Sequence, residues 1–374
     1  MHKGIRTIFL MMGSSCNANC IYCMQGDKEK KSEAPLPSEI NNSIYHFIDD
    51  MCTDTMKLNK EKNWDGKFTL LFFGGEPLLY FDKIKEIVER VEKINPFVSF
   101  SIITNGLLIN KEVCEYLNAH NFEVTVSWDG KNSTQTRGFD VFNTKNAENI
   151  LLLDQLSVNA IISNRAYPED IFESFGVLNE VYTKIHDYPV NPMTEPLIID
   201  KRCSPMDLDD FNEEKIFSQM KEATLWYLNV KENDIPLEPD TYPKYKIMDF
   251  LYTNYKNNKE NNSVIFREAC CCGWDNMNID LAGNLYPCHN LKTSLGNIDD
   301  MEMNTYFQEL MKYEMRETFS RKECNECEVR YSCEGGCKMV TDEIKERYCS
   351  YKKMLYRGMI EGIKEHEKNK EVTD

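Results

Sequence analysis

Long hydrophobic runs are missing from this sequence. No stretch of about 18 consecutive apolar residues occurs, which argues against a transmembrane helix. Residues 1–12 include basic residues but no small-residue cleavage site, which argues against a secretory signal peptide. We therefore expect a cytoplasmic protein with no membrane partner.

Positive charge is also scarce. The 44 Lys and Arg residues are outnumbered by 61 Asp and Glu residues, and the formal net charge is −17. Because phosphate backbones bind basic patches, this balance argues against nucleic acid as the main partner. The acidic balance identifies no other partner.

Cysteine, by contrast, is abundant. The 374 residues include 15 cysteines, most of them in one early motif or in the last third of the chain. A chain of this length can form one large domain with an appendage, or two domains, and its core does not need disulfide bonds. Since no export signal is present, so many cysteines indicate metal or redox chemistry rather than disulfides.

The early motif places Cys16, Cys20 and Cys23 at C-x3-C-x2-C spacing, just after the apolar run 8–12. Soft thiolates suit iron–sulfur clusters, and three cysteines leave one iron of a [4Fe–4S] cluster without a protein ligand. An open iron can bind and activate a ligand, as open catalytic metal sites do. The alternative, a zinc site, needs a fourth ligand nearby, and the closest histidines are His2 and His46.

The first half of the chain alternates short apolar strands with amphipathic helices. We expect strands at 7–12, 68–73, 98–103, 124–128 and 157–162, with a short sixth at 197–199. We expect helices at 37–51, 81–94, 111–118, 143–153 and 168–185. This alternation predicts a parallel sheet with right-handed crossovers. A doubly wound sheet and a parallel barrel fit it equally well.

A glycine-rich turn, Gly74-Gly75-Glu76-Pro77, follows the second expected strand. Two glycines let the backbone approach a ligand closely, and the proline fixes the exit of the turn. Glu76 or the neighbouring carbonyl groups can accept hydrogen bonds from an ammonium group. The alternative is an ordinary turn between a strand and a helix.

The last third carries a second, ordered set of cysteines. A cysteine triplet is followed by G-x4-C, then by C-x2-C-x5-C-x3-C and a final cysteine. A C-x2-C pair alone favours zinc, whereas the long ordered set favours iron–sulfur clusters. Because residues i and i+2 of an extended chain share a face, we expect two of the three consecutive cysteines to bind. Of the triplet we expect Cys270 and Cys272, and the later cysteines of the set are Cys288, Cys324, Cys327, Cys333, Cys337 and Cys349.

Together these motifs resemble the radical S-adenosylmethionine (radical SAM) enzymes that carry a C-terminal SPASM extension. The resemblance covers most of the chain except about 201–265. It implies an α/β fold, namely a partial (β/α)6 TIM-like barrel with a small cysteine-rich C-terminal Fe–S domain. The implied domains are the barrel at 1–200, a helical bridging region at 201–265, the SPASM domain at 266–350 and a helical tail at 351–374.

The resemblance also implies the cofactors, which are S-adenosylmethionine and three [4Fe–4S] clusters. The early motif would hold the cluster that cleaves S-adenosylmethionine. By the family's connectivity, one auxiliary cluster has four cysteine ligands, and Cys288 and Cys337 bind the other with one or two residues of the triplet. If only one of the triplet binds, the second cluster has an open iron for a substrate thiolate. The four-ligand set is Cys324, Cys327, Cys333 and Cys349.

Further residues are assigned to S-adenosylmethionine by the same resemblance. The GGEP turn is expected to bind its amino group, and a cationic Arg137 its carboxylate. The aromatic residue before the third cysteine of the early motif can pack against a flat ligand. The expected contacts are Tyr22, Gly74, Gly75, Glu76, Thr104, Asn105, Ser127, Asp129 and Arg137.

The family's reaction begins when the first cluster gives one electron to S-adenosylmethionine. Homolysis then yields methionine and a 5′-deoxyadenosyl radical, which abstracts a hydrogen atom from the substrate. Auxiliary clusters accept the electron left after oxidation or bind the substrate, and the protein supplies position and electrostatics. A reducing partner such as flavodoxin or ferredoxin is expected.

Relatives with a SPASM extension mostly modify peptides or protein side chains. We favour a maturase that acts on a ribosomally made precursor peptide and forms a thioether or another crosslink, often at Cys. The alternative is an anaerobic sulfatase-maturating enzyme, which forms formylglycine from Cys or Ser. That enzyme has an aspartate as proposed base where this chain has His289, our catalytic candidate. A non-catalytic zinc or Fe–S scaffold is a third hypothesis.

Some parts of the chain carry no motif of their own. The bridging region is expected to hold helices at 207–228 and 244–255, and the charged end from residue 360 a solvated helix face. The residues before Cys16 are too few for an N-terminal peptide-recognition domain. Leader binding is therefore expected at the barrel rim, at the bridging region or on a separate protein.

Overall fold

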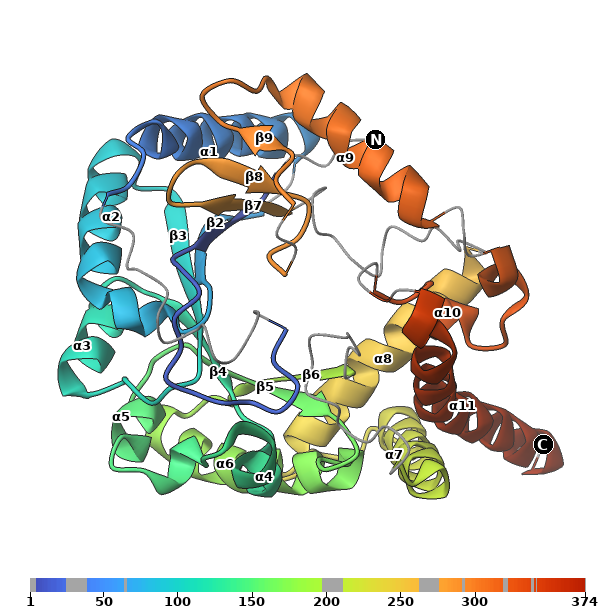
Figure 1. Cartoon of the computed structure of the whole chain (residues 1–374). Helices are drawn as coiled ribbons and strands as arrows, with labels where there is room; N and C mark the ends of the chain where they lie inside the picture. Colours follow the sequence, from blue (N-terminus) through green and yellow to red (C-terminus); the bar gives the residue numbers. More distant parts are fainter. Residues whose placement is uncertain are drawn as a thin grey trace.

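A single curved sheet organises the computed structural model (Figure 1). The structure describes residues 5–24, 39–63, 66–196, 211–261, 276–290, 293–318, 322–337, 340 and 342–373. The strand order is β6-β5-β4-β3-β2-β1-β7-β8-β9. The strands are β1 Thr7–Met11, β2 Phe68–Phe73, β3 Val98–Thr104, β4 Glu123–Ser127, β5 Leu156–Ile162, β6 Asn191–Pro196, β7 Asn276–Asp280, β8 Asn284–Tyr286 and β9 Gly296–Asn297.

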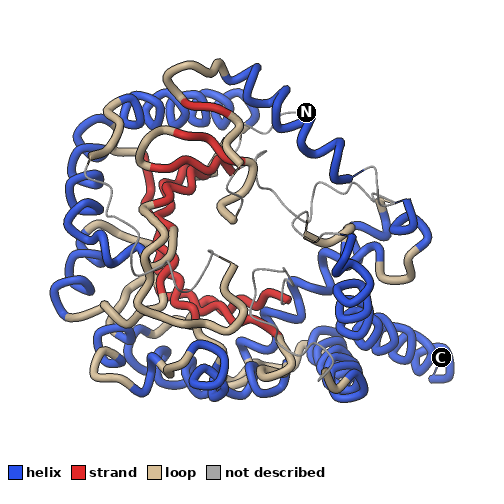
Figure 2. Tube along the Cα trace, viewed as in Figure 1, coloured by secondary structure: helices blue, strands red, loops and turns tan. Residues whose placement is uncertain are grey.

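Strands β1 to β6 are all parallel to their neighbours, with connecting helices between them. Figure 2 shows the strands on the inside of an arc and the helices around its outside. This confirms the expected α/β fold and, of the two architectures that fit the sequence, the partial six-stranded barrel.

Helices cover the outer face of this arc and continue beyond it. None of those within the described ranges is both long and apolar enough to cross a bilayer. The helices are α1 Ser43–Lys62, α2 Phe81–Ile94, α3 Lys111–Ala119, α4 Ser133–Arg137, α5 Ala147–Leu151, α6 Pro168–His186, α7 Glu213–Glu232, α8 Tyr242–Glu260, α9 Met303–Thr318, α10 Arg330–Cys333 and α11 Asp342–Thr373. Short 3-10 turns are η1 Pro77–Tyr80, η2 Gly130–Asn132, η3 Val141–Asn143 and η5 Lys322–Glu326.

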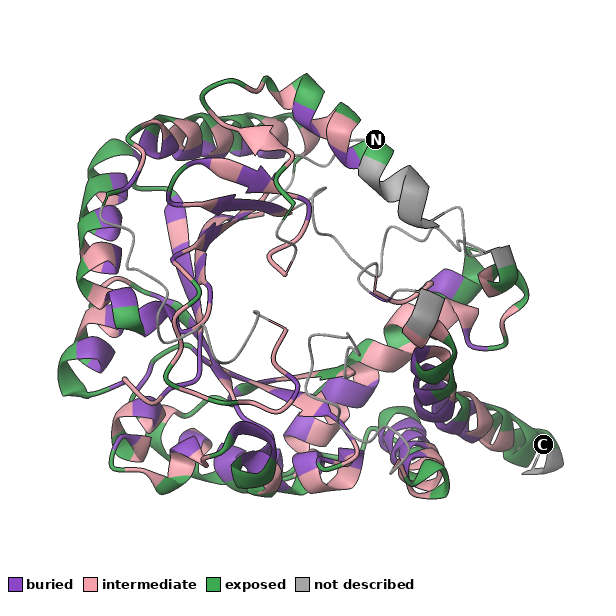
Figure 3. Cartoon of the chain, in the orientation of Figure 1, coloured by how far each residue is buried: buried purple, intermediate pink, exposed green. Residues whose placement is uncertain are grey.

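The barrel strands alternate between two environments. In β1, β2 and β5, every second residue is buried and the residues between them are partly exposed. Because successive side chains point to opposite faces of a strand, one face packs under the helices and the other lines the barrel interior. Figure 3 shows the buried positions concentrated where strands and helices meet.

Strand β7 extends the barrel sheet, which the sequence did not predict. It pairs in parallel with β1, placing Asn278 beside Phe9 and Asp280 beside Met11. Strands β8 and β9 then add antiparallel pairs. The cysteine-rich region expected from residue 266 therefore shares one continuous sheet with the barrel.

Several expected elements lie elsewhere. The sixth strand is at 191–196, and residues 197–199, where we expected it, lie outside the described residues. Helix α1 begins at Ser43 and ends at Lys62, later at both ends than expected. The boundary expected at 350 falls inside α11. The solvated face expected from residue 360 was wrong for its first turn, because Ile363 is buried with 5% of its surface exposed.

Helix α11 packs closely on α7. A Cβ atom on Gly358 would lie 2.3 Å from the Phe217 carbonyl oxygen and 3.0 Å from the Met220 Cβ, and one on Gly362 would lie 2.9 Å from the Lys221 carbonyl oxygen. Glycine is therefore required at Gly358 for backbone contact between the two helices.

We expect Gly358→Ala to lower the free energy of unfolding by about 1–3 kcal/mol, because the added methyl group forces the two helices apart. Alanine is otherwise the better helix former by about 1 kcal/mol, so any net loss reports the clash. Denaturant unfolding of this variant and of Lys368→Ala, at an exposed position of α11, measures the effect. A Gly358→Ala variant that is as stable as the wild type, or more stable, would contradict the expected net loss.

Candidate active site and cluster sites

The early cysteines lie on the loop that follows β1, at the carboxyl end of the barrel sheet. All three are partly exposed. Burial raises the pKa of the Cys20 thiol to about 11; nearby Arg137 lowers it, and the thiols of Cys23 and Cys16 raise it further. The three sulfurs are therefore near enough to interact electrostatically, and cluster assembly must displace a proton from Cys20.

The GGEP turn packs directly against this loop. The Gly75 amide donates to the Gly13 carbonyl at 2.8 Å, and the Glu76 amide donates to the Ser15 carbonyl at 2.8 Å. A Cβ atom on Gly75 would lie 2.3 Å from the Ser15 carbonyl oxygen, and Gly74 has a φ of +149°. Glycine is needed at both positions because the backbones touch.

The carboxylate of Glu76 is buried and fully engaged inside the protein. It accepts hydrogen bonds from the Thr104 hydroxyl at 2.6 Å, the Asn105 amide at 2.7 Å and the Leu78 amide at 3.0 Å. The Asn105 side chain donates to the Asn17 side chain at 2.7 Å and lies 3.9 Å from the Cys16 sulfur. Of the two acceptors considered for a ligand ammonium group, this geometry favours the backbone carbonyls of the turn.

Glu76 should make stability depend on pH. Burial raises its pKa to about 7, although the hydrogen bonds from Asn105, Thr104 and Leu78 lower it. A raised pKa means that the folded state holds the proton more tightly, so this stabilisation is lost as pH rises through 7. From pH 6 to pH 8 we expect the wild type to lose about 1 kcal/mol relative to Glu76→Gln. Denaturant unfolding of the wild type and Glu76→Gln at pH 6 and pH 8 measures this loss, with Glu89→Gln on the exposed side of α2 as control. A difference in stability between the two proteins that does not change with pH would contradict the prediction.

Asp129 joins the cysteine loop that follows β1 to the fourth strand. This fully buried residue accepts from the guanidinium of Arg137 at 3.0 Å (Nε) and 2.9 Å (Nη2), and from the Tyr22 hydroxyl. It also accepts from the Thr136 hydroxyl at 2.6 Å and the Ile161 amide at 2.8 Å. The Arg137 guanidinium lies 5.5 Å from the centre of the Tyr22 ring. Residues of this network therefore fix the position of the loop.

The assignment of Arg137 to a ligand carboxylate stays a prediction. Its Nε and Nη2 donate hydrogen bonds to Asp129. The structure therefore shows that Arg137 also positions Asp129. Ser127 ends β4, two residues before Asp129, and is partly exposed. Sequence reasoning missed Thr136, since a lone threonine in a short helix gives no signal.

His289 lies against the interior face of the barrel. Its ring stacks on Phe9 at 5.1 Å between centroids and meets Phe73 edge-on at 4.6 Å, next to the GGEP turn. Part of the residue is exposed to solvent, but its Nδ1 atom is buried and has no hydrogen-bond partner in the described chain. Burial lowers the pKa of His289 to about 4, so its imidazole is neutral at pH 7. A neutral imidazole nitrogen without a partner can accept a proton.

Asn278 is a second interior polar group, and sequence reasoning missed it. It lies beside Phe9 in β7 and is 0% exposed. Neither its amide nitrogen nor its amide oxygen has a hydrogen-bond partner among the described residues. Buried polar groups in folded proteins are usually hydrogen-bonded, so this carboxamide is available to a bound ligand.

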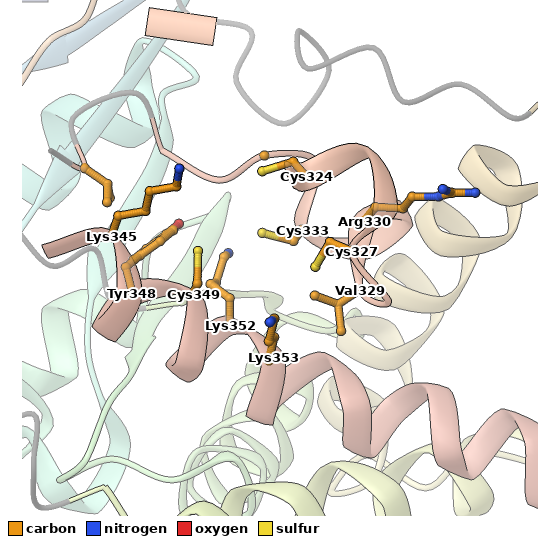
Figure 4. Close-up of a pocket in the computed structure, with 12 residues that line it drawn as sticks. Cys324, Cys327, Val329, Arg330, Cys333, Lys345, Tyr348, Cys349, Lys352 and Lys353 are labelled. Atoms are coloured by element: carbon orange, nitrogen blue, oxygen red, sulfur yellow. The ribbon is translucent and has the colours of Figure 1, made fainter. Parts of the chain in front are cut away.

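Four of the late cysteines line one cavity. Figure 4 shows their sulfurs turned toward a common space, with Cys349 on α11 opposite the other three. Burial is the main cause that raises the pKa of Cys333, and Lys352 opposes it. The four are the set expected to close one auxiliary cluster: Cys324, Cys327, Cys333 and Cys349.

The remaining expected ligands are less completely described. Cys337 and Cys288, which are assigned to a different cluster, are both partly exposed. That assignment stays a prediction, and Cys270 and Cys272 lie outside the described residues. No group of three or more His, Cys, Asp or Glu side chains in the described ranges is arranged to hold a single metal ion.

Comparison with known proteins agrees with this geometry. The model of the radical SAM superfamily matches residues 10–178. The radical SAM cyclopropyl synthase TigE of Paramaledivibacter caminithermalis is 24% identical over 98% of this chain and 75% of its own length. A cysteine-type anaerobic sulfatase-maturating enzyme of Clostridium perfringens is 23% identical over 91% of this chain and 93% of its own length.

Solved structures share the fold. Native anSMEcpe with bound AdoMet and the Kp18Cys peptide superposes with a TM-score of 0.64 at 17% identity, covering 95% of this chain and 98% of that one. Streptococcus suis SuiB bound to the precursor peptide SuiA superposes with a TM-score of 0.56 at 14% identity. The match covers 90% of this chain and 72% of that one. The cysteine loop after β1, the glycine turn after β2 and the matched family model lead to one conclusion. Residues 10–178 of this chain form a radical SAM domain.

Proposed function

We propose that this enzyme oxidatively modifies a residue of a ribosomally made precursor peptide, forming a thioether or another crosslink. When bound, the first cluster and S-adenosylmethionine supply the 5′-deoxyadenosyl radical that removes a hydrogen atom from the substrate. The modified residue then loses one electron and one proton. The residues of this chain hold the ligand, position the peptide and receive that proton.

The observation that carries the proposal is the pair of unpartnered polar groups on the interior face beside the GGEP turn. Nδ1 of His289 and both amide atoms of Asn278 are buried there without partners in the described chain. A peptide brings backbone N–H and C=O groups that match a carboxamide. The precursor-bound SuiB and the peptide-bound anSMEcpe, whose fold this chain shares, support a peptide as the substrate class.

His289 is assigned as the proton acceptor. We expect His289→Phe, which preserves the stacking on Phe9 and Phe73, to lower the yield of modified peptide about 10²–10⁴-fold. Formation of 5′-deoxyadenosine should continue, because the residue lies outside the cysteine loop. Quantifying both products by mass spectrometry tests this, with His46→Phe on α1 as control. Equal loss of both products would place His289 in cofactor binding instead.

Three [4Fe–4S] clusters complete the proposal. Anaerobically purified protein should then contain about twelve irons per chain. Cys16, Cys20 and Cys23 would hold the first, and the four cavity cysteines one auxiliary cluster. A flavodoxin- or ferredoxin-like protein would supply the electron.

The sulfatase-maturating function is the second candidate, supported by a relative that matches along nearly its whole length. Mass spectrometry separates the two after incubation with a precursor peptide or a sulfatase-derived peptide. Loss of two hydrogens alone indicates a thioether, whereas loss of two hydrogens together with replacement of sulfur by oxygen indicates formylglycine formed from Cys. Modification of the sulfatase peptide alone would overturn the preferred assignment.

A further inference from the structure

The charged side chains described in the lining of the four-cysteine cavity are all basic. Among the described residues, its lining includes four basic side chains and no acidic one, although the whole chain has a net charge of −17. The basic side chains are Arg330, Lys345, Lys352 and Lys353. Three of these, Arg330, Lys345 and Lys353, are partly exposed, so water can solvate their charge.

Lys345 pairs with Glu323, and Arg330 donates to the Asn325 carbonyl oxygen and the Tyr331 hydroxyl. Lys353 is only partly buried.

Lys352 differs from the other three. It follows Cys349 by three residues on α11, so both side chains lie on one helix face. Only 6% of Lys352 is exposed, and Figure 4 shows its end turned toward the same space as the Cys349 sulfur. The ammonium donates to the Tyr356 hydroxyl at 3.3 Å and lies 5.0 Å and 5.7 Å from the rings of Tyr356 and Tyr348.

No carboxylate forms an ion pair with Lys352 in the part of the chain that the structure describes. Glu195 is near enough to interact electrostatically, but its hydrogen bond comes from Asn159 at 3.1 Å. A buried ammonium without an acidic partner is costly unless another negative charge lies beside it. Four cysteine thiolates around an iron–sulfur core supply such a charge, because they outweigh the positive charge of the core.

We propose that Lys352 is the buried counter-charge of the cluster at Cys324, Cys327, Cys333 and Cys349 and raises its reduction potential. Reduction adds a negative charge to the cluster, and a fixed cation stabilises the reduced form more than the oxidised form. The inference rests on the auxiliary cluster of the proposed function. It makes this cluster the better acceptor for the electron that leaves the oxidised peptide residue.

The test is a redox titration followed by electron paramagnetic resonance. Full-length protein with Cys16, Cys20 and Cys23 all replaced by alanine leaves only the auxiliary clusters, and Cys349→Ser identifies the signal of the four-cysteine cluster. At the wild-type midpoint, Lys352→Met should show about tenfold less reduced relative to oxidised cluster, equal to about 59 mV. Lys352→Arg, which keeps the charge, should titrate like the wild type, as should Lys364→Met, an exposed position on the same helix.

The controls separate charge from structure. An unchanged midpoint in Lys352→Met, or an equal shift in Lys352→Arg, would overturn the role of the charge. Lys352→Gln provides a second neutral variant if the methionine variant does not fold, and it should shift in the same direction. If Cys349→Ser lost neither iron nor signal, the four-cysteine cluster would itself be wrong, an outcome distinct from failure of the lysine inference.

Discussion

Cys20→Ala should abolish the formation of 5′-deoxyadenosine from S-adenosylmethionine. Cys20 is the middle ligand of the early motif, and its thiol lies close to those of Cys16 and Cys23. With two thiolates left, the loop can no longer hold a cubane cluster with one open iron. We expect at least a thousandfold fall in 5′-deoxyadenosine and a loss of about four of about twelve irons per chain.

The matched control is Cys114→Ala. Cys114 is a buried thiol on α3 that lies outside both cysteine sets and is 4% exposed. Anaerobic reconstitution, dithionite reduction and chromatography of the products should show wild-type iron and product for this variant. If Cys20→Ala kept 5′-deoxyadenosine within tenfold of the wild type, the early cysteines would not form the reactive centre.

Asp129→Ala should cause the largest loss of stability. The substitution removes the ion-pair partner of Arg137, which is 6% exposed. It also removes the acceptor of hydrogen bonds that Tyr22, Thr136 and Ile161 donate. Breaking a buried ion pair on one side typically costs about 3–5 kcal/mol, because the remaining charge stays buried without a partner. Denaturant unfolding should show a loss of this size together with weaker iron retention, since Tyr22 belongs to the cluster loop.

A double variant separates charge from volume in this network. Asp129→Leu combined with Arg137→Met removes both charges, so it should be more stable than Asp129→Ala. Tyr22→Phe removes one hydrogen bond and should cost only about 1–3 kcal/mol. Wild-type stability of Asp129→Ala would show that the network does not hold the loop.

Local sequence pattern predicted much of the barrel. The residues 68–73 and 81–94 were expected and found with the same bounds, because a short apolar run and an amphipathic stripe both lie between clear turn signals. Helix α1 was placed too early, since Pro37 and Ser38 resemble a helix start. Its second half was missed because the buried side there carries Cys52, Thr55 and Asn59, which form no apolar stripe.

Long-range pairing and buried polar groups could not be predicted. Nothing in the sequence indicates that β7 pairs with β1, because pairing joins residues that are far apart in the chain. Asn278 and Lys352 look like ordinary surface residues in sequence, and only the fold buries them. The resemblance to a known family, in contrast, grouped the four cysteines that line one cavity.

The electron paramagnetic resonance spectrum of the dithionite-reduced enzyme, recorded with and without S-adenosylmethionine, tests the central claim most directly. If the loop after β1 holds a cluster with one open iron, adding S-adenosylmethionine should change the spectrum of the wild type and leave that of Cys20→Ala unchanged. A wild-type spectrum that does not respond to S-adenosylmethionine would contradict the open iron and the radical chemistry proposed to start there.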